Sequence, residues 1–145
     1  MWLPHVTVAV VVQKDDKFLM VEEFDDSRRV FNQPAGHVEH GENITDAALR
    51  ETLEETCWQV RLSSVLGISR FIAPNGSTYF RHSFVADAVE EQKDATRDPD
   101  ITAVHWMALD DIVSKTSQLR SPMVMSDIEL FLSGNTHSLD LYADI

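Results

Sequence analysis

The stretch from Gly36 to Trp58, GHVEHGENITDAALRETLEETCW, constrains this chain more than any other. A loop with two glycines leads into an acidic segment in which Glu51, Glu54 and Glu55 stand at positions i, i+3 and i+4. On a helix this spacing places three carboxylates on one face, where like charges repel by roughly a few tenths of a kcal/mol per pair. Acids in the last turns also face the negative end of the helix dipole. A bound cation reverses the sign of both effects, and oxygen donors are typical ligands of Mg²⁺ or Mn²⁺.

The alternative interpretation of these acids is a solvated helix face. Such a face usually mixes charges of both signs, whereas Arg50 is the only basic residue between Asp46 and Trp58. Zinc sites typically use His and Cys ligands, so an all-carboxylate set argues against zinc. The sequence therefore favours a site for a hard divalent cation.

Six charged or glycine positions of this stretch match, at every spacing, the Nudix box of the Nudix hydrolases. These positions are Gly36, Glu42, Arg50, Glu51, Glu54 and Glu55. Two other positions depart from the pattern, because Thr52 stands where the family has an aliphatic residue and Cys57 where it has glycine. In the family that glycine follows the helix, so a positive φ at Cys57 would cost about 1 kcal/mol or more relative to glycine.

The resemblance extends beyond the box, and nearly the whole chain is similar to the phosphatase NudJ subgroup of that family. Three further segments carry it: Pro4–Ala9, Phe31–His37 and Leu119–Pro122. The resemblance implies an α/β fold, a Nudix-type α/β/α sandwich with a mixed β-sheet, formed by residues 1–145 as a single domain. It also implies a hydrolase of nucleoside tri- and diphosphates and of thiamine-pathway pyrophosphates such as hydroxymethylpyrimidine diphosphate, with release of inorganic phosphate.

Hydrolysis of a phosphoanhydride bond requires that charge on the phosphoryl oxygens is neutralised and that a water molecule is oriented for attack. Mg²⁺, or Mn²⁺ in its place, supplies both when it is held by the acids of the box. The expected ligands are Glu51, Glu54 and Glu55, to which the resemblance adds the Gly36 carbonyl. By the same resemblance, Glu42 and Arg50 are structural and join the loop to the helix through an ion pair.

Glu51 and Glu54 are the expected catalytic residues, and Glu51 is the first choice for the general base. In relatives the base can come from a later loop, which here offers Asp98 and Asp100. The alternative for both aspartates is an ordinary solvated carboxylate.

Basic residues are scarce in this chain, so the arginines near the box are candidates for contacts with substrate phosphates. We expect Arg28, Arg29 and Arg81 to serve this role, because guanidinium groups bind phosphate in a bidentate manner. Exposed turn or strand arginines are the alternative for each. Phe31 is a candidate to stack on a base or pyrimidine ring, and the alternative for it is a place in the core.

The charge balance limits the partners of this protein. Its 145 residues carry 24 acids against 12 basic residues, a formal charge of −12, which disfavours nucleic acid polymers and anionic membranes. A small phosphorylated substrate is repelled as well unless divalent ions and placed arginines reverse the local field. Cys57 is the only cysteine and the apolar run Val6–Val12 is too short to span a bilayer, so a cytoplasmic protein is expected. A homodimer is a family-level expectation.

The pattern along the chain predicts an α/β order of elements, with a buried strand over Val6–Val12 that pairs with Lys17–Glu23. Phe24–Ala35 is expected to be a loop, and Thr45 to cap an acidic helix that ends near Thr56 with Ile44, Ala48 and Leu49 on its inner side. The remaining expectations are a hairpin of Arg61–Ile72 and Thr78–Val89, a loop over Glu90–Asp100, a strand over Ile101–Met107, helices over Ala108–Ser114 and Pro122–Leu132, and a loose tail after Gly134.

A second hypothesis of a different class is a non-catalytic binding module that senses a nucleotide on the same fold. It is motivated by the altered positions Thr52 and Cys57 and by the acidic surface. Such modules usually lose one or more glutamates of the box, and this chain keeps all of them. The sequence therefore favours the hydrolase.

Overall fold

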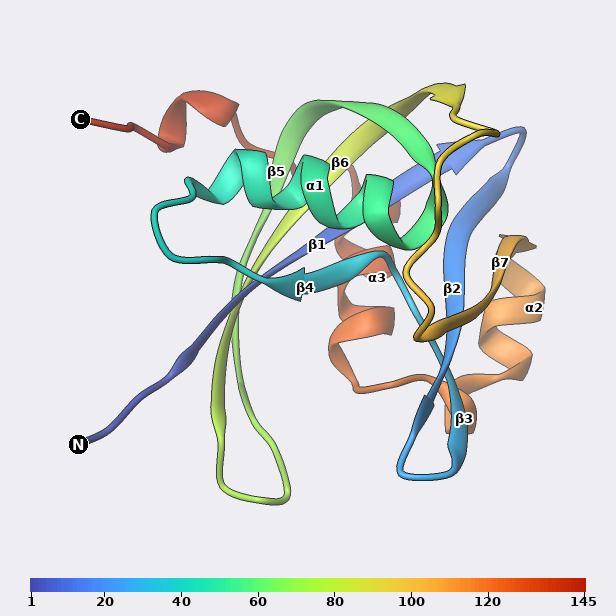
Figure 1. Cartoon of the computed structure of the whole chain (residues 1–145), viewed down its shortest axis with the longest axis horizontal. Helices are drawn as coiled ribbons and strands as arrows, with labels where there is room; N and C mark the ends of the chain where they lie inside the picture. Colours follow the sequence, from blue (N-terminus) through green and yellow to red (C-terminus); the bar gives the residue numbers. More distant parts are fainter.

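The computed structural model describes residues 1–145 and contains a mixed seven-stranded β-sheet with helices on both faces (Figure 1). The strands are β1 (His5–Lys14), β2 (Lys17–Asp25), β3 (Arg28–Asn32), β4 (Ala35–His37), β5 (Trp58–Ile72), β6 (Thr78–Glu91) and β7 (Ile101–Ala108). The helices are α1 (Ile44–Thr56), α2 (Leu109–Ser114) and α3 (Met123–Ser133), with short 3₁₀ turns at Thr116–Gln118 and Leu139–Leu141. The predicted α/β/α sandwich with a mixed sheet is confirmed.

Strand β1 lies at the centre of the sheet and joins its two parts. It pairs in parallel with β6 from His5 to Val12, and its first half pairs antiparallel with β4. Its last two residues form the predicted hairpin with β2, which also pairs with β3 and β7. Parallel central strands are covered on both faces, which explains why Val8 to Val12 are all buried apolar residues.

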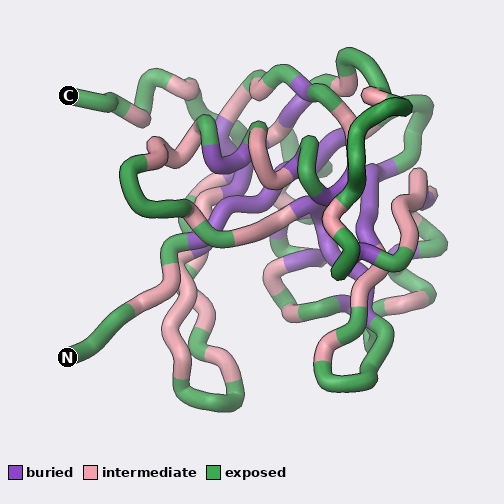
Figure 2. Tube along the Cα trace, in the orientation of Figure 1, coloured by how far each residue is buried: buried purple, intermediate pink, exposed green.

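The side chains on the two faces of β1 pack into two separate hydrophobic cores. Val8, Val10 and Val12 pack with Ala47 and Ala48 of α1 on one face. On the other face, Val11 belongs to a second core that includes residues from α2 and α3, among them Ile112, Val124 and Ile128. Figure 2 shows the buried residues concentrated along the central strands, while the hairpin tips and both termini are exposed.

The expectation that Phe24–Ala35 is a loop is wrong, because β3 and the start of β4 lie within it. The turn between β2 and β3 is made by Asp26 and Ser27, which both have positive φ (49° and 72°). Two consecutive residues of this kind form the tight turn that matches strand twist, usually with glycine or asparagine. The segment therefore lacks the residues that normally indicate a hairpin.

The N-cap of helix α1 lies two residues before the predicted one. Asn43 is the N-cap, and its side chain accepts a hydrogen bond from the Asp46 backbone N–H at 2.8 Å, so the assignment of this role to Thr45 is wrong. Ala48 is fully buried as expected, whereas Leu49 is 37% exposed and does not face the core. The helix ends at Thr56, as predicted.

The remaining elements follow the predicted order with small shifts at their ends. The β5–β6 hairpin is longer than expected and continues through Glu91, so that the exposed loop covers residues 92–100. Helix α3 ends at Gly134, which has a left-handed backbone (φ 72°), as predicted. No helix has the length and apolar character needed to cross a membrane.

The segment after Gly134 packs on the sheet, in contrast to the looseness expected from its polar composition. His137 and Val65 exchange two backbone hydrogen bonds of 2.8 Å each. The Tyr142 hydroxyl lies 2.6 Å from Nδ1 of His82, and its ring packs against Phe84 at 5.4 Å between centroids. The tail thereby covers the end of the core that contains Phe84.

Candidate active site

The loop that contains β4 lies directly against helix α1. Gly36 has no room for a side chain, because a Cβ atom there would lie 2.1 Å from Cδ of Glu51. One turn further along the helix, Oε1 of Glu55 accepts a hydrogen bond from the Ala35 backbone N–H at 2.8 Å. The glycine of the box therefore lets the carboxylate of Glu51 reach the backbone of the loop, beside the buried Glu55.

Nearby positive charge does not fully compensate the carboxylates of Glu51 and Glu55. Burial raises the pKa of Glu55 to about 9, against the hydrogen bond from Ala35, and the nearby Glu23, Glu51 and Asp98 raise it further. Burial also raises the pKa of Glu51, although Arg50 opposes this shift. A site that raises the pKa of two neighbouring acids in this way is typical of a functional site or of one that takes up a cation.

Arg50 connects the loop to the helix. It donates to both oxygens of Glu42, from Nε at 2.6 Å and from Nη2 at 2.9 Å, and Nη2 also donates to the His37 carbonyl at 3.0 Å. The ion pair expected of these two residues is therefore present in bidentate form. Nη1 of Arg50 donates to Glu51 at 2.9 Å and to Glu54 at 3.1 Å, and the hydrogen bond to Glu42 is the main cause of its raised pKa.

No group of three His, Cys, Asp or Glu side chains is arranged closely enough to hold a metal ion by itself. Arg50 holds the carboxylates of Glu51 and Glu54, while Glu55 is bonded to the Ala35 N–H. The donors nevertheless fit a hard divalent cation in kind, since all are oxygens and the raised pKa values of Glu51 and Glu55 show that nearby positive charge does not fully compensate these two carboxylates. The fit therefore rests on charge and on donor chemistry.

The loop over residues 92–100 contacts the end of α1. The backbone N–H of Asp98 donates to the Glu54 carbonyl at 2.9 Å, and the Asp98 carboxylate contributes to the raised pKa of Glu51 and of Glu55. Asp100 is exposed, and its backbone N–H donates to Oδ1 of Asp98. Of the two aspartates considered for a general base, Asp98 thus lies in the electrostatic environment of the box.

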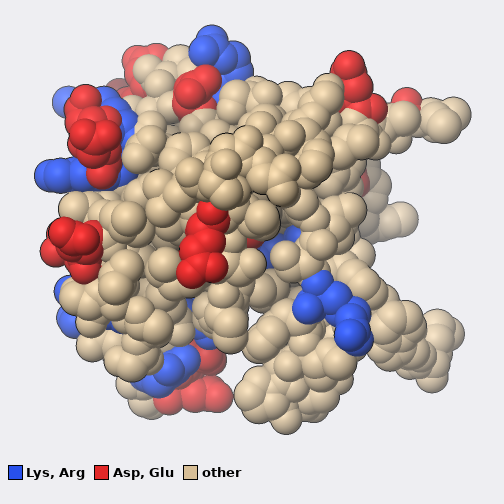
Figure 3. All heavy atoms as spheres, turned by 180° about the vertical axis from the view of Figure 1, so that it is seen from behind, with Lys and Arg blue, Asp and Glu red and all other residues tan.

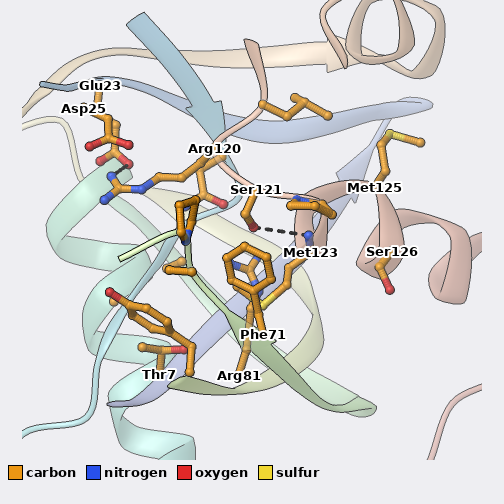
Figure 4. A pocket seen from close by; sticks show the side chains of 18 of the residues that line it. Thr7, Glu23, Asp25, Phe71, Arg81, Arg120, Ser121, Met123, Met125 and Ser126 are labelled. Atoms are coloured by element: carbon orange, nitrogen blue, oxygen red, sulfur yellow. Dashed lines mark hydrogen bonds and ion pairs between the residues drawn. The ribbon is translucent and has the colours of Figure 1, made fainter. Parts of the chain in front are cut away.

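A cavity of about 1070 Å³ adjoins Gly36 and extends away from the box. Figure 4 shows Arg120 paired with Glu23 at one end, and Phe71, Met123 and Arg81 grouped at the other. Acidic side chains are spread over the face shown in Figure 3, with basic ones among them, so the net negative charge is not gathered in one patch there.

Two of the predicted substrate residues line this cavity and two do not. Arg28 and Arg81 both line it, Arg28 as an exposed residue and Arg81 as a buried one. Phe31 is only 3% exposed and belongs to the second hydrophobic core, while the Arg29 guanidinium lies over the Phe31 ring at 5.5 Å. The core interpretation of Phe31 therefore describes its observed position.

Several residues of the cavity were not identified from the sequence. Arg120 and Glu23 form an ion pair within it, and Asn32 and Tyr79 also line it. Arg120 and Asn32 lie in segments that carry the family resemblance, which was the only available signal for either residue. The others come together only through the pairing of distant strands.

Arg81 is held by a buried polar network. Its Nε donates to Asp127 at 3.0 Å and its Nη2 to Gln33 at 2.6 Å, and Ser83 donates to the same oxygen of Asp127 at 2.9 Å. Burial raises the pKa of Asp127, while Arg81 and Ser83 oppose this shift. The guanidinium of Arg81 is consequently fixed in place.

The two departures from the box have local structural explanations. Thr52 is fully buried, and its hydroxyl donates to the Ala48 carbonyl at 2.8 Å, so its polar atom is satisfied within the helix. Cys57 follows the helix with φ 62° and ψ 14°, the left-handed conformation in which glycine is favoured. Neither departure displaces the glutamates of the box.

Comparisons of sequence and structure with known proteins all find NUDIX proteins or phosphatases named NudJ. A family model described as the NUDIX domain matches residues 3–127. Relatives named "Phosphatase NudJ" include one from Shigella sonnei, 36% identical, and one from Escherichia coli, 35% identical, each over 99% of this chain and 94% of the relative. A solved structure titled "NUDIX hydrolase from Nitrosomonas europaea" has a TM-score of 0.96 and 38% identity, covering 99% of this chain and 98% of the other. A MutT NUDIX hydrolase from Burkholderia pseudomallei, 22% identical over 88% of this chain and 98% of the other, shares the fold with a TM-score of 0.74.

Proposed function

This chain belongs to the NUDIX hydrolase family, and on that premise we propose that it is a Mg²⁺-dependent hydrolase of nucleoside tri- and diphosphates and of pyrophosphates such as hydroxymethylpyrimidine diphosphate. Its relatives and structural neighbours support a hydrolase that acts on phosphoanhydride bonds. Inorganic phosphate is the expected product, in keeping with relatives that are named phosphatases.

The observation that carries this proposal is the pairing of Glu51 and Glu55 with the backbone of the Gly36 loop. Glu55 is buried and Glu51 is largely shielded from water, both have raised pKa values, and the residues they pack against, Ala35 and Gly36, line the cavity of about 1070 Å³. Maintaining two acids in this position is unfavourable without a cation. A divalent ion therefore accounts for an arrangement that is otherwise destabilising.

The residues that would hold Mg²⁺, or Mn²⁺, are the Gly36 carbonyl and the carboxylates of Glu51, Glu54 and Glu55. When bound there, the ion supplies neutralisation of phosphoryl charge and a lowered pKa for a coordinated water molecule. Arg50 holds the carboxylates of Glu51 and Glu54 at defined positions through Nη1. Its bidentate pair with Glu42 fixes the loop relative to the helix.

The substrate would extend from the box into the cavity. Arg120 lies beside Glu23 at one end of the cavity (Figure 4), and Arg28 is paired with Asp25 across the β2–β3 turn, so both guanidinium groups would contact phosphate oxygens there. Glu51 is the first choice for the base that accepts a proton from the attacking water, because its raised pKa brings it closer to neutral pH. Asp98 is the second choice for the base, since its carboxylate lies close enough to raise the pKa values of Glu51 and Glu55.

The proposal is tested with Glu54→Gln, because Glu54 is half exposed and its replacement leaves the buried acids in place. We expect the variant to lose activity by about 100-fold or more on nucleotides with Mg²⁺, as removal of a single electrostatic group often does. Glu90→Gln, an exposed substitution on β6, is the matched control and should retain wild-type turnover.

The reaction should be followed with Mg²⁺ and with Mn²⁺ on a panel of nucleotides and pyrimidine diphosphates, with separate detection of phosphate and pyrophosphate. Equal turnover by wild type and Glu54→Gln would remove the proposed role of the box. Binding without turnover of any substrate would instead favour the nucleotide-sensing module.

A further inference from the structure

One carboxylate of the cavity lies outside the box. Glu22 and Glu23 are consecutive residues of β2, so their side chains point to opposite faces of the sheet. The pairing of β2 with β7 shifts register between them, with Glu22 opposite Ala103 and Glu23 opposite Ile101. Irregularities of this kind redirect a side chain and are frequent beside active sites. Glu23 lines the cavity together with Gly36, and its side chain is only 13% exposed.

Glu23 holds the guanidinium of Arg120 at a single nitrogen. Its carboxylate accepts a hydrogen bond from Nη1 of Arg120, and the Arg120 backbone N–H donates to the Phe31 carbonyl at 2.9 Å. Nε and Nη2 of Arg120 have no hydrogen-bond partner in the protein, and the side chain is 43% exposed. Arg120 is therefore anchored at both its backbone and its side chain, yet it keeps donors for a ligand (Figure 4).

Arg120 and Glu23 also lie within electrostatic reach of the box. Burial lowers the pKa of His37, the residue after Gly36, and the charge of Arg120 lowers it further. Glu23 adds to the effect of burial in raising the pKa of Glu55. The pair consequently stands beside the loop and the helix that carry the proposed metal ligands.

A purely stabilising role does not account for this pair. Ion pairs with an exposed partner add little stability, and Arg120 is nearly half exposed. The neighbouring Glu22 has such a structural role, because its carboxylate lies 3.2 Å from both Oγ1 of Thr102 and Nε2 of His105 and so links β2 to β7. Glu23 instead holds a group whose free nitrogens are of the kind that binds phosphate.

We propose that Glu23 is a positioning residue for phosphate recognition. It holds Nη1 of Arg120 so that Nε and Nη2 bind a phosphate group of the substrate, next to the phosphate held at the box. A guanidinium of fixed orientation binds phosphate through two parallel hydrogen bonds and loses less conformational freedom on binding. Glu23 also repels the phosphate, but Arg120 neutralises much of its charge, so orientation outweighs repulsion.

This role rests on the proposed function, and it is tested by separating KM from kcat on the most rapidly hydrolysed nucleotide of the panel. Glu23→Ala should raise KM about 10-fold with kcat unchanged, because it removes a contribution to binding and not to the chemical step. Glu23→Gln keeps an acceptor for Nη1 and should retain a KM close to that of the wild type. Glu22→Ala is the matched control on the same strand and should change neither constant.

An unchanged or lowered KM in Glu23→Ala would overturn the inference, as would a KM in Glu23→Gln as high as that in Glu23→Ala. A second variant shows whether Glu23 acts through Arg120. Arg120→Ala should raise KM at least as much as Glu23→Ala, and the double variant should show no further rise. Independent, multiplicative increases in KM would contradict the positioning role.

A binding measurement separates this inference from the proposed function. Calorimetric titration with α,β-methylene-ADP, whose bridging carbon prevents hydrolysis between the phosphates, should give a Kd about 10-fold higher in Glu23→Ala than in the wild type when Mg²⁺ is present. That difference without turnover of any phosphoanhydride would contradict the hydrolase proposal alone. Turnover by the wild type with equal Kd in the two proteins would contradict the positioning role alone, and absence of both binding and turnover would contradict both.

Discussion

The Arg81–Asp127 pair is the most deeply buried ion pair of this protein. The two side chains are 5% and 1% exposed and lie 3.0 Å apart, in a wall that also borders the cavity. Desolvation of two charges offsets much of their attraction, so such a pair adds little net stability while it remains intact. Its role here is to fix the guanidinium of Arg81. Removal of one partner while the other charge stays buried should lower the free energy of unfolding substantially.

Asp127→Asn should destabilise the protein by about 3–5 kcal/mol, because it leaves the buried guanidinium without a counter-charge. Asp87→Asn breaks the exposed pair with Arg61, whose atoms lie 3.6 Å apart, and should cost about 0.5 kcal/mol or less. Urea unfolding monitored by circular dichroism measures both free energies of unfolding. Similar small losses in the two variants would show that Asp127 does not stabilise the Arg81 charge.

Helix α1 carries the glutamates of the box and ends in a conformation that its sequence does not favour. Cys57 has φ 62°, and its Sγ makes only a long contact of 3.6 Å with the Ala95 carbonyl. A β-carbon is strained in this conformation, whereas glycine is not. The turn at Cys57 therefore stores backbone strain immediately after the helix that carries the glutamates of the box.

Cys57→Gly should stabilise the protein by about 1 kcal/mol, because relief of strain at a left-handed position outweighs the added freedom of the unfolded chain. Gly134→Ala, at the end of α3 with φ 72°, is the matched control and should destabilise by a similar amount. Both changes are measured by chemical denaturation. If Cys57→Gly proves no more stable than the wild type, the strain assigned to this turn is absent.

The elements of the fold differ in how far they were predictable, for identifiable reasons. The β5–β6 hairpin was predicted because Asn75-Gly76 is a strong turn signal. Strand β3 was missed because its turn uses Asp26 and Ser27, which rarely adopt positive φ in pairs. The N-cap was misplaced because Asn43 and Thr45 are both good capping residues, and only the hydrogen bond to Asp46 distinguishes them.

Across the whole molecule, the box was predictable and the cavity of about 1070 Å³ beside it was not. Gly36, Glu51 and Glu55 are linked by one loop and one helix, so their spacing alone brings them together. The cavity walls come from strands β1 to β6, from the segment before α3 and from α3 itself, and most of these elements meet only through long-range contacts. Arg81 was identified as a candidate by its charge, but its partner Asp127 lies 46 residues away.

The net charge of −12 means that the protein as a whole repels anionic molecules. Under the proposed function, a phosphorylated substrate would have to approach an acidic protein and bind near Glu51 and Glu55, two carboxyl groups whose pKa values are already raised. A divalent cation bound there would offset the charge of both the carboxylates and the substrate, whereas the arginines of the cavity would contact only the substrate. The central claim is therefore that Glu51, Glu54 and Glu55 bind Mg²⁺.

Calorimetric titration of the substrate-free protein with Mg²⁺ tests this claim most directly, with Glu55→Gln as the comparison. The pKa of Glu55, about 9 without a cation, exceeds its ordinary value, so at neutral pH the metal must displace a proton from this residue. Saturable binding at millimolar Mg²⁺ is predicted, with higher affinity at pH 8 than at pH 6 and an affinity at least roughly 10-fold lower in Glu55→Gln. Absence of binding by the wild type, or equal affinity in the variant, would contradict the account.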